Sequence, residues 1–320
     1  MPSTTLLPNT FVIGAPKCGT TALSTYLSTH PNIFLVSPKE SNFWSSDIRQ
    51  PDNFGLDSTE KYFALFAGAS RQHTIRIDAS TSYLWSSVAV PAILSAMPDA
   101  RFVIMLRNPI DLAYACYMEE TFWLHEDLPT FEEAWHACAD RRAGLQIPSL
   151  CPDGQKLDYE RIASVGTQLR NVQRLAPSGQ YLVLFLDDLS ADPLQTYRRT
   201  LSFLKLPDDG RLHFPRINPA KAVSSPVVSK LLLYPPWPLC RASKLARRLA
   251  WSLGVRGLRD TLYRRLNTVR ERAPLTPEFA NLLEERFREE IDLVSELTGR
   301  DLSLWLTTKP PVPGLHGVVQ

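Results

Sequence analysis

Residues 11–21, FVIGAPKCGTT, predict a strand, a turn that contains glycine, and the start of a helix. Phe11 to Ile13 form an apolar, β-branched run that is typical of a buried strand. After the turn, Thr20 and Thr21 are natural caps for a helix. This order directs backbone N–H groups and the positive end of a helix dipole at one point. The segment therefore predicts a phosphate-binding strand, loop and helix in an α/β protein.

The spacing of the loop residues resembles, but does not match, a nucleoside-triphosphate loop. Gly14 and Gly19 satisfy the two glycines of G-x-x-x-x-G. The pattern then requires Lys followed by Ser or Thr, and this chain has Thr20 and Thr21 instead. The lysine lies inside the loop, at Lys17. We therefore expect a bound phosphate that is held differently from the way an NTPase holds it.

The segment FVIGAPKCGTTAL, followed by LSTHPNIFLVSPKESNFW, resembles the donor-binding end of sulfotransferases that use 3′-phosphoadenosine 5′-phosphosulfate (PAPS). The likeness is strongest to the bacterial and carbohydrate branch, which includes the heparan-sulfate enzymes. It implies that Lys17 stabilises the departing phosphate, and that no metal is needed. The loop residues implied to bind the donor are Pro16, Lys17, Cys18, Gly19, Thr20 and Thr21.

Lys39 and Glu40 precede two aromatic residues, Phe43 and Trp44. The residues alone favour a solvated charge pair beside a hydrophobic anchor, because loops are usually polar. The resemblance implies instead that Glu40 is the general base. That role requires a carboxylate within hydrogen-bond reach of the acceptor hydroxyl.

A second anion site is predicted after the strand 101–106, the clearest buried strand of the sequence. The strand leads into Arg107, after which Asn108 can cap a helix and Pro109 occupies its favoured first position. The carboxyl edge of a parallel sheet is where α/β proteins bind ligands. The resemblance implies that Arg107 binds the 3′-phosphate of the donor, with Lys221 as a weaker candidate.

Three positions depart from the family pattern. Ala79 stands where the heparan enzymes have a second catalytic lysine, Ala115 where a serine is usual, and Val165 where a tyrosine is usual. These departures leave open a non-catalytic, membrane-associated binding protein. Asp78 ends an apolar strand, so it also has a rival interpretation as the magnesium ligand of an NTPase or kinase.

His125 is the second candidate for acid–base chemistry, because the heparan enzymes have histidines in the corresponding segment near the acceptor. An ordinary, partly exposed loop histidine is an equally good interpretation. Residues 131–142 and 159–176 are each predicted to form one helix, and residues 144–158 are predicted to form a loop that sets specificity.

Composition excludes several classes. The chain has 320 residues and a net charge of +2, which does not favour nucleic-acid binding. Its five cysteines form no C-x-x-C pair, which favours a reducing, cytoplasmic setting. No signal peptide is recognised at the N-terminus, and no apolar run has the ~20 residues of a membrane span.

Residues 241–272 carry ten basic and two acidic side chains, a net charge of +8. The segment is partly amphipathic, so peripheral contact with an anionic membrane is one interpretation. A solvated helical face that attracts an acidic substrate or the donor is the other.

We therefore expect a single α/β domain over residues 1–320, with a core at 11–306 and a loose tail at 307–320. Its central sheet is mostly parallel and flanked by helices. The expected reaction is sulfuryl transfer from PAPS to a hydroxyl of a glycan or small-molecule acceptor, leaving 3′,5′-ADP. A P-loop kinase or NTPase is the alternative.

Overall fold

The computed structural model describes residues 6–50, 55–217 and 272–306. The chain divides into two compact units. The first unit comprises residues 1–116, 158–218 and 275–320, and the second comprises 117–157 and 219–274. Each unit is described by itself, and the expectation of one domain over the whole chain stays a prediction.

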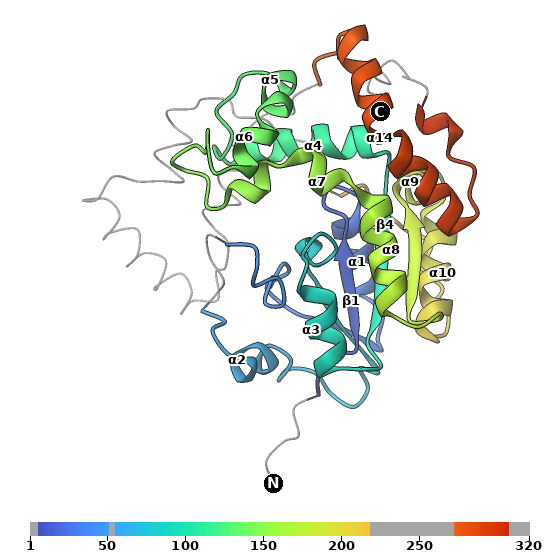
Figure 1. Ribbon diagram of the computed structural model, residues 1–320. Helices are drawn as coiled ribbons and strands as arrows, with labels where there is room; N and C mark the ends of the chain where they lie inside the picture. The colour runs from blue at the N-terminus through green and yellow to red at the C-terminus, as the bar shows by residue number, and fades with distance from the viewer. Residues whose placement is uncertain (1–5, 51–54, 218–271, 307–320) are drawn as a thin grey trace, which may run out of the picture. The chain divides into compact units, whose positions relative to one another are not determined.

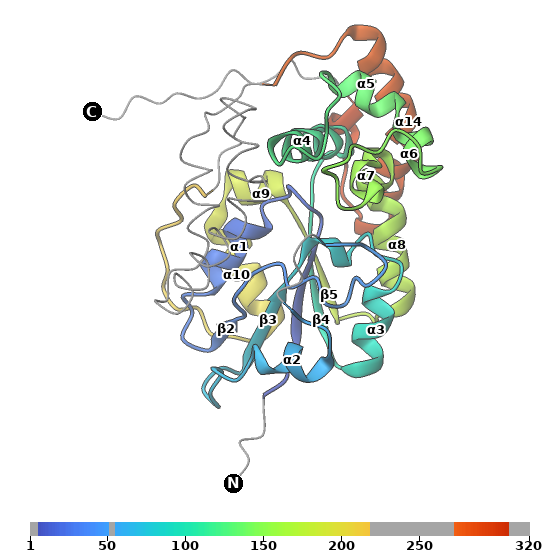
Figure 2. The ribbon, with the colours of Figure 1, turned by 90° about the vertical axis from the view of Figure 1, so that its left-hand side faces the viewer.

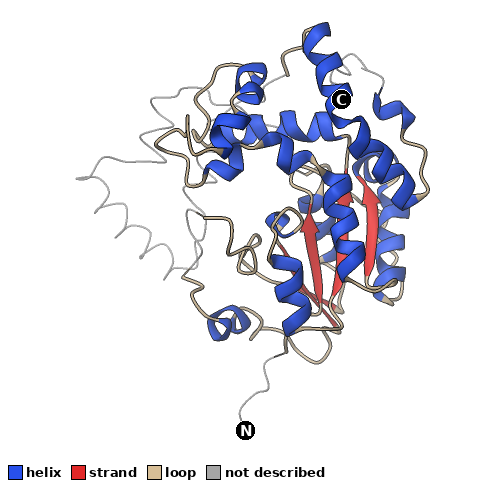
Figure 3. Cartoon of the chain, viewed as in Figure 1, coloured by secondary structure: helices blue, strands red, loops and turns tan. Residues whose placement is uncertain are grey.

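The first unit contains a five-stranded sheet in the order β2-β3-β1-β4-β5. Every neighbouring pair is parallel, as the strand arrows in Figure 3 show. The strands are β1 (Thr10–Gly14), β2 (Ile33–Leu35), β3 (Ile75–Ala79), β4 (Arg101–Leu106) and β5 (Tyr181–Phe185). The predicted parallel α/β sheet is confirmed.

Helices cover both faces of this sheet, which explains why β1 is buried at every position. Figure 2 shows α1 (Thr20–Leu27) and α10 (Pro193–Leu204) on one face, and α3 (Ala89–Ala96) and α8 (Val165–Leu175) on the other. The long helix α14 (Pro277–Thr298) packs against α8 (Figure 1). The first unit is thus a three-layer arrangement around a buried sheet.

Shorter helices complete the description. In the first unit they are α2 (Thr59–Ala64), η1 (Thr81–Tyr83), α7 (Tyr159–Ala163), α9 (Leu186–Ala191) and η3 (Ser303–Leu306). In the second unit they are α5 (Phe131–His136), α6 (Cys138–Arg142) and η2 (Gly154–Leu157). The boundary between the units falls within α4 (Pro109–Phe122).

Two predicted helices are each divided in the structure. Residues 131–142 form α5 and α6, which meet at Ala137. Residues 159–176 form α7 and α8, which meet at Ser164. The Ser164 hydroxyl donates to the carbonyl of Glu160 at 2.9 Å, and such serine-to-backbone bonds bend helices. The prediction of one continuous helix in each segment was therefore wrong.

The strand order fixes where a ligand can bind. Strand β1 lies in the middle of the sheet. Strands β2 and β3 are placed on one side of it, and β4 and β5 on the other, so the strand order reverses at β1. Open α/β sheets bind ligands outside the carboxyl ends of the strands at such a reversal. The loop that follows β1 and the residues that follow β4 both lie at this edge.

Candidate donor-binding and catalytic site

The loop after β1 depends on two glycines. Gly14 has φ of 143° and Gly19 has φ of 83°, conformations that favour glycine. A Cβ on Gly14 would lie 2.8 Å from Leu84 Cβ and 3.0 Å from the Thr81 carbonyl oxygen. A Cβ on Gly19 would lie 2.9 Å from Leu186 Cδ1. Both glycines are therefore required by dihedral angle and by space.

Helix α1 starts directly after this loop. Gly19 is its N-cap residue, and no side chain caps the helix. The prediction that Thr20 or Thr21 is the cap was wrong, because the left-handed turn at Gly19 makes Thr20 the first helical residue. The first turn of α1 contains no acidic residue, so no carboxylate there opposes the positive end of the helix dipole.

The structure brings the two predicted anion-binding segments together. Arg107, directly after β4, donates from Nη1 to the carbonyl oxygen of Lys17 at 3.1 Å. The loop is also tied to β4 by the Ala15 N–H, which donates to the Met105 carbonyl oxygen at 2.7 Å. The backbone of the loop and the guanidinium of Arg107 therefore form one local structure.

Arg107 retains an unused donor at this place. Its Nη2 lies 3.4 Å from Asp111 Oδ2, and its Nε is buried and has no hydrogen-bond partner among the described residues. A buried donor without a partner is unfavourable unless a ligand or water satisfies it. The guanidinium fork is well suited to phosphate oxygens. These residues fit a phosphate group of the donor.

Cys18 belongs to the loop, but its side chain points into the protein. The thiol is fully buried, and burial raises its pKa to about 12. Any contact of Cys18 with an anion must therefore come from its backbone. The side chain of Lys17, unlike that of Cys18, is exposed to solvent. The backbone of Lys17 is left-handed, with φ of 58°.

The cap of α4 is confirmed. Asn108 Oδ1 accepts a hydrogen bond from the Ile110 N–H at 2.9 Å. Asn108 also donates from Nδ2 to the Trp305 carbonyl oxygen at 2.8 Å, which ties η3 to this edge of the sheet. The residue next to Arg107 is therefore fixed from both sides.

Glu40 is half-buried and is held by three donors. Its Oε2 accepts from the backbone N–H of Thr81 at 2.7 Å and from the Thr81 hydroxyl at 3.1 Å. Its Oε1 lies 2.5 Å from Lys39 Nζ. A carboxylate offers about four lone-pair positions, so the contacts within the described ranges leave one position on Oε1 unused. The charge pair of Lys39 and Glu40 was one of the two interpretations of the sequence, and the ion pair is present in a partly buried form. Thr81 was not predicted to hold Glu40.

The backbone around Glu40 is anchored to the end of β3. The Glu40 N–H donates to the carbonyl oxygen of Ala79 at 3.0 Å, and Glu40 itself has φ of 63°. The next residue, Ser41, donates its hydroxyl to Asp78 Oδ2 at 2.9 Å. Glu40 is therefore held by its own side chain and by the residue that follows it.

Asp78 is fully buried and receives four hydroxyl hydrogen bonds. These come from Ser41, Tyr62, Ser80 and Tyr83, at distances of 2.8–2.9 Å. Burial raises the pKa of Asp78, and the hydroxyl donors only partly offset it. Burial and the nearby Asp78 charge raise the pKa of Tyr62 and of Tyr83 well above the usual value. Because hydroxyl groups occupy both carboxylate oxygens, the magnesium-ligand interpretation of Asp78 finds no support here.

The aromatic pair after Glu40 points into this buried cluster. Phe43 stacks on Tyr62 with ring centroids 4.5 Å apart and planes at 10°. Trp44 packs edge-on against the same ring at 5.4 Å. The pair is therefore a hydrophobic anchor for the loop that carries Glu40.

His125 belongs to the second unit and is 7% exposed. Its Nδ1 donates to Glu120 Oε2 at 2.6 Å, and its backbone N–H donates to the Glu120 carbonyl oxygen at 2.9 Å. A carboxylate that accepts from Nδ1 fixes the orientation of an imidazole ring. The interpretation of His125 as a partly exposed loop residue is not supported, and its role in acid–base chemistry stays a prediction.

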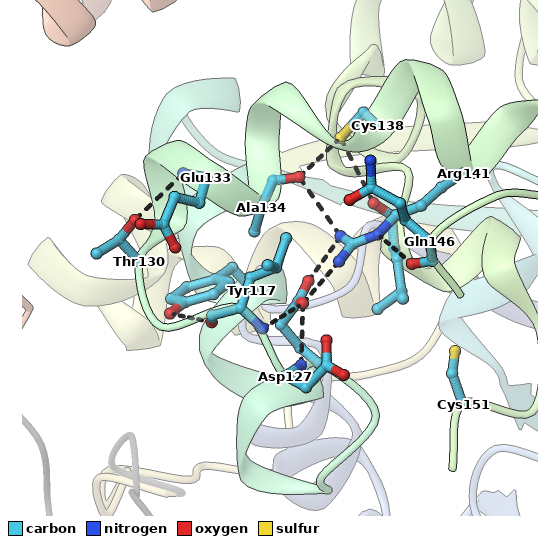
Figure 4. A network of polar contacts seen from close by, with 12 residues as sticks. Tyr117, Asp127, Thr130, Glu133, Ala134, Cys138, Arg141, Gln146 and Cys151 are labelled. Carbon is cyan, nitrogen blue, oxygen red and sulfur yellow. Dashed lines mark hydrogen bonds and ion pairs between the residues drawn. The ribbon is translucent and has the colours of Figure 1, made fainter. Parts of the chain in front are cut away.

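The segment after His125 is held by a buried ion pair between Glu126 and Arg141. Figure 4 shows Arg141 and the polar contacts around it. Two hydrogen bonds of 2.7 Å join their side chains, which are both 0% exposed. Glu126 Oε1 also accepts from the N–H groups of Asp127 and Leu128, each at 3.0 Å. Arg141 donates further to the carbonyl oxygens of Ala134 and Gln146, each at 3.4 Å. This pair was not predicted.

Several predicted features lie wholly or partly outside the described residues. Lys221 is one of them, and only Arg272 of the basic segment 241–272 is described. Among the helices of the described ranges, none has both the length and the apolar character needed to cross a membrane. Of the three departures from the family pattern, Ala79 and Val165 are completely buried, and Ala115 is 8% exposed.

The fold and site define an α/β protein with a phosphate-binding loop at the reversal of its sheet. A family model described as "Sulfotransferase domain" matches residues 7–214. The chain therefore belongs to the sulfotransferase domain family, as its sequence motifs predicted.

Known relatives match parts of this chain. It is 32% identical over 121 residues to the bifunctional heparan sulfate N-deacetylase/N-sulfotransferase 1 of Caenorhabditis elegans, covering 38% of this chain and 14% of that protein. It is 29% identical over 139 residues to the membrane-associated sulfotransferase kil1 of Dictyostelium discoideum, covering 42% and 28%. For human bifunctional heparan sulfate N-deacetylase/N-sulfotransferase 3, the identity is 27% over 203 residues, covering 62% and 22%. The chain thus spans less than a third of each of these proteins.

A solved structure shares the fold over nearly the whole chain. The sulfotransferase from Alicyclobacillus acidocaldarius superposes with a TM-score of 0.68 at 23% identity, covering 94% of this chain and all of that one. At this level of identity, the likeness establishes the fold.

Proposed function

We propose that this protein transfers a sulfuryl group from PAPS to an acceptor hydroxyl, with 3′,5′-ADP as the second product. The observation that carries the proposal is the Nε of Arg107, which is buried beside the backbone of the Lys17 loop and has no hydrogen-bond partner within residues 6–50, 55–217 and 272–306. A guanidinium with an unused donor next to a helix N-terminus suits a ligand with more than one phosphate group. The donor in this family has that chemistry.

Each residue has a distinct role in the proposed reaction. Arg107 binds the 3′-phosphate, and the backbone of residues 16–21 with the Thr20 and Thr21 hydroxyls binds the 5′-phosphate. Lys17 places positive charge where the departing phosphate develops negative charge, which is the stabilisation that lowers a transition-state barrier. A bond forms between the acceptor oxygen and sulfur as the bond between sulfur and the bridging oxygen breaks.

Glu40 accepts the acceptor proton in this proposal. The free lone-pair position on its Oε1 supports the role, because general-base catalysis requires hydrogen-bond reach between base and hydroxyl. His125 is the second candidate, supported by the hydrogen bond of 2.6 Å that orients its ring. The proposed acceptor is a glycan, since the relatives in two of the three comparisons above have names that refer to heparan sulfate.

Donor binding is tested by calorimetric titration with 3′,5′-ADP, using 5′-AMP and Mg-ATP for comparison. We expect metal-independent binding of 3′,5′-ADP that is much weaker for 5′-AMP. Arg107→Ala should weaken it by roughly 10- to 100-fold, since hydrogen bonds to charged groups are worth about 1.5–3 kcal/mol. Arg101→Ala, at the opposite end of β4, is the matched control and should bind normally. Preference for Mg-ATP would instead support a kinase.

Transfer is tested with radiolabelled PAPS and a fixed panel of acceptors: N-desulfated heparin, unsulfated heparan backbone and 2-naphthol. We expect label in a glycan. Label only in the free amine of N-desulfated heparin would contradict hydroxyl transfer, and label only in 2-naphthol would contradict the glycan. Glu40→Gln and His125→Gln then decide which residue is the base.

A further inference from the structure

Thr81 lies between the proposed base and the donor loop. It is the first residue of η1, two residues after the end of β3. Its backbone N–H and its hydroxyl both donate to the same oxygen of Glu40, Oε2, at 2.7 and 3.1 Å. Two donors on one oxygen fix the direction of the carboxylate and leave Oε1 on the other side.

The opposite side of Thr81 meets the start of the donor loop. Its carbonyl oxygen lies 3.0 Å from the position that a Cβ on Gly14 would occupy. The flanking residues are bonded to β1 as well: the Ser80 N–H donates to the Val12 carbonyl oxygen at 3.1 Å, and the Leu84 N–H to that of Ile13 at 2.8 Å. Residues 80–84 are therefore fixed against the end of β1.

The loop that carries Glu40 is bonded to the same segment. The Asn42 N–H donates to the Ser80 hydroxyl at 3.1 Å, and the Ser82 hydroxyl donates to Asn42 Oδ1 at 2.6 Å. Ser45 and Ser82 share a further hydrogen bond of 2.8 Å. These contacts restrain the loop backbone, and Thr81 is the residue of this segment that bonds the carboxylate itself.

We propose that Thr81 is a positioning residue that sets the distance between the base carboxylate of Glu40 and the donor loop. The inference rests on the proposed function, because it requires Glu40 to act on an acceptor beside the donor. Thr81 acts through Glu40 and takes no proton itself. Its hydroxyl determines the orientation of Oε2, and thereby where Oε1 meets the acceptor. The backbone hydrogen bonds from Ser80 and Leu84 to the end of β1 fix this arrangement relative to the loop proposed to bind the departing phosphate.

The test uses Thr81→Val, which removes the hydroxyl and keeps the shape and the backbone N–H. We expect kcat to fall about tenfold, because misplacing a reacting group slows a reaction even when binding is intact. The affinity for 3′,5′-ADP should stay within twofold of wild type. Thr81→Ser should restore kcat. Thr200→Val is the matched control, since its buried hydroxyl donates within α10 to the Thr196 carbonyl oxygen at 2.9 Å.

A double-mutant cycle with Glu40→Ala separates this inference from the proposed function. If Thr81 acts through Glu40, adding Thr81→Val to Glu40→Ala should change the residual rate by less than twofold. A low rate for Glu40→Ala with a normal rate for Thr81→Val would overturn the positioning role alone. A normal rate for Glu40→Ala would overturn both the base assignment and this inference.

A second measurement keeps the inference testable if no acceptor of the panel is labelled. The thermal midpoints of wild type, Thr81→Val, Glu40→Ala and the double variant report the contact between Thr81 and Glu40 directly. We expect the two single substitutions to have less than additive effects on the midpoint. Additive effects would show that the hydroxyl does not hold the carboxylate, and would overturn the proposal.

Discussion

Arg107 in the first unit and Arg141 in the second unit are both arginines with little solvent contact, and they differ in how their donors are used. Arg141 forms two hydrogen bonds of 2.7 Å with Glu126 and contacts two backbone carbonyl oxygens. Arg107 forms one hydrogen bond with Lys17 and a longer contact with Asp111, and its Nε has no partner in the part of the chain that the structure describes.

The different use of the donors of Arg141 and Arg107 distinguishes an arginine that stabilises the fold from one that is available to bind a ligand. A protein tolerates a buried ion pair when its polar atoms are satisfied internally, as they are for Glu126 and Arg141. A buried donor left without a partner is unfavourable until a ligand or water satisfies it. Arg141 therefore belongs to the folding of its unit, and Arg107 to the proposed donor site.

The largest effect is expected from Arg141→Met, which leaves Glu126 buried without its partner. Breaking such a pair costs about 3–5 kcal/mol of stability. Thermal and urea unfolding measure the loss. The double variant Glu126→Leu with Arg141→Met should recover much of it, because no unpaired charge remains. A loss for Arg141→Met that is no larger than that for Arg107→Met would break the comparison.

Lys17→Ala should affect catalysis and leave stability nearly unchanged. Removing one stabilising charge from a transition state commonly lowers kcat by about 10²–10³-fold. Initial rates at saturating donor measure this effect, and the thermal midpoint provides the control. Near-normal turnover by the Lys17→Ala variant would show that the proposed stabilisation of the departing phosphate is wrong.

Arginine-to-lysine substitutions sharpen the comparison further. Arg107→Lys keeps the charge but loses the guanidinium fork, so we expect affinity for 3′,5′-ADP to fall by about tenfold with unchanged stability. Arg141→Lys should show the reverse: lower stability and unchanged affinity. The two quantities are read by calorimetry and thermal unfolding. Equal effects of both substitutions on affinity would contradict the division into binding and structural roles.

The smallest effect concerns Asp78, whose pKa is raised by burial above its usual 3.8. A raised pKa in the folded state means that stability present at low pH is lost as pH rises through that pKa. Wild type should therefore lose thermal stability relative to Asp78→Asn as pH rises above the usual carboxyl pKa of 3.8. A difference between the two midpoints that stays constant with pH would show that Asp78 does not titrate in this way.

The sequence predicted the central features of the fold because they depend on local patterns. The apolar run at 101–106 became β4 with the predicted bounds, and Asn108 caps α4 as expected. Two predicted helices were divided in the structure. At Ser164 the helix is interrupted where the Ser164 hydroxyl donates to the Glu160 carbonyl oxygen. The hydrophobic periodicity of the sequence does not predict such a bond.

The candidate site could be predicted only in part. Lys17, Glu40 and Arg107 were identified from motifs, and their proposed roles stay predictions. The Lys39–Glu40 charge pair was among the interpretations of the sequence, but Thr81 was not identified as a residue that holds Glu40, because it forms no motif with Glu40 by residue type or spacing. Glu120, which accepts a hydrogen bond from His125, was likewise not identified from the sequence.

The sequence by itself determined the parallel α/β class, the glycine-dependent loop and the family, since dihedral preference, hydrophobic period and motif spacing are properties of the chain. Only the tertiary structure decided which polar groups are satisfied. It paired Glu126 with Arg141, gave Asp78 four hydroxyl donors, and left Nε of Arg107 without a partner among the residues that the structure describes. The physical reason is that hydrogen-bond satisfaction depends on distances between residues far apart in the chain, and these exist only after folding.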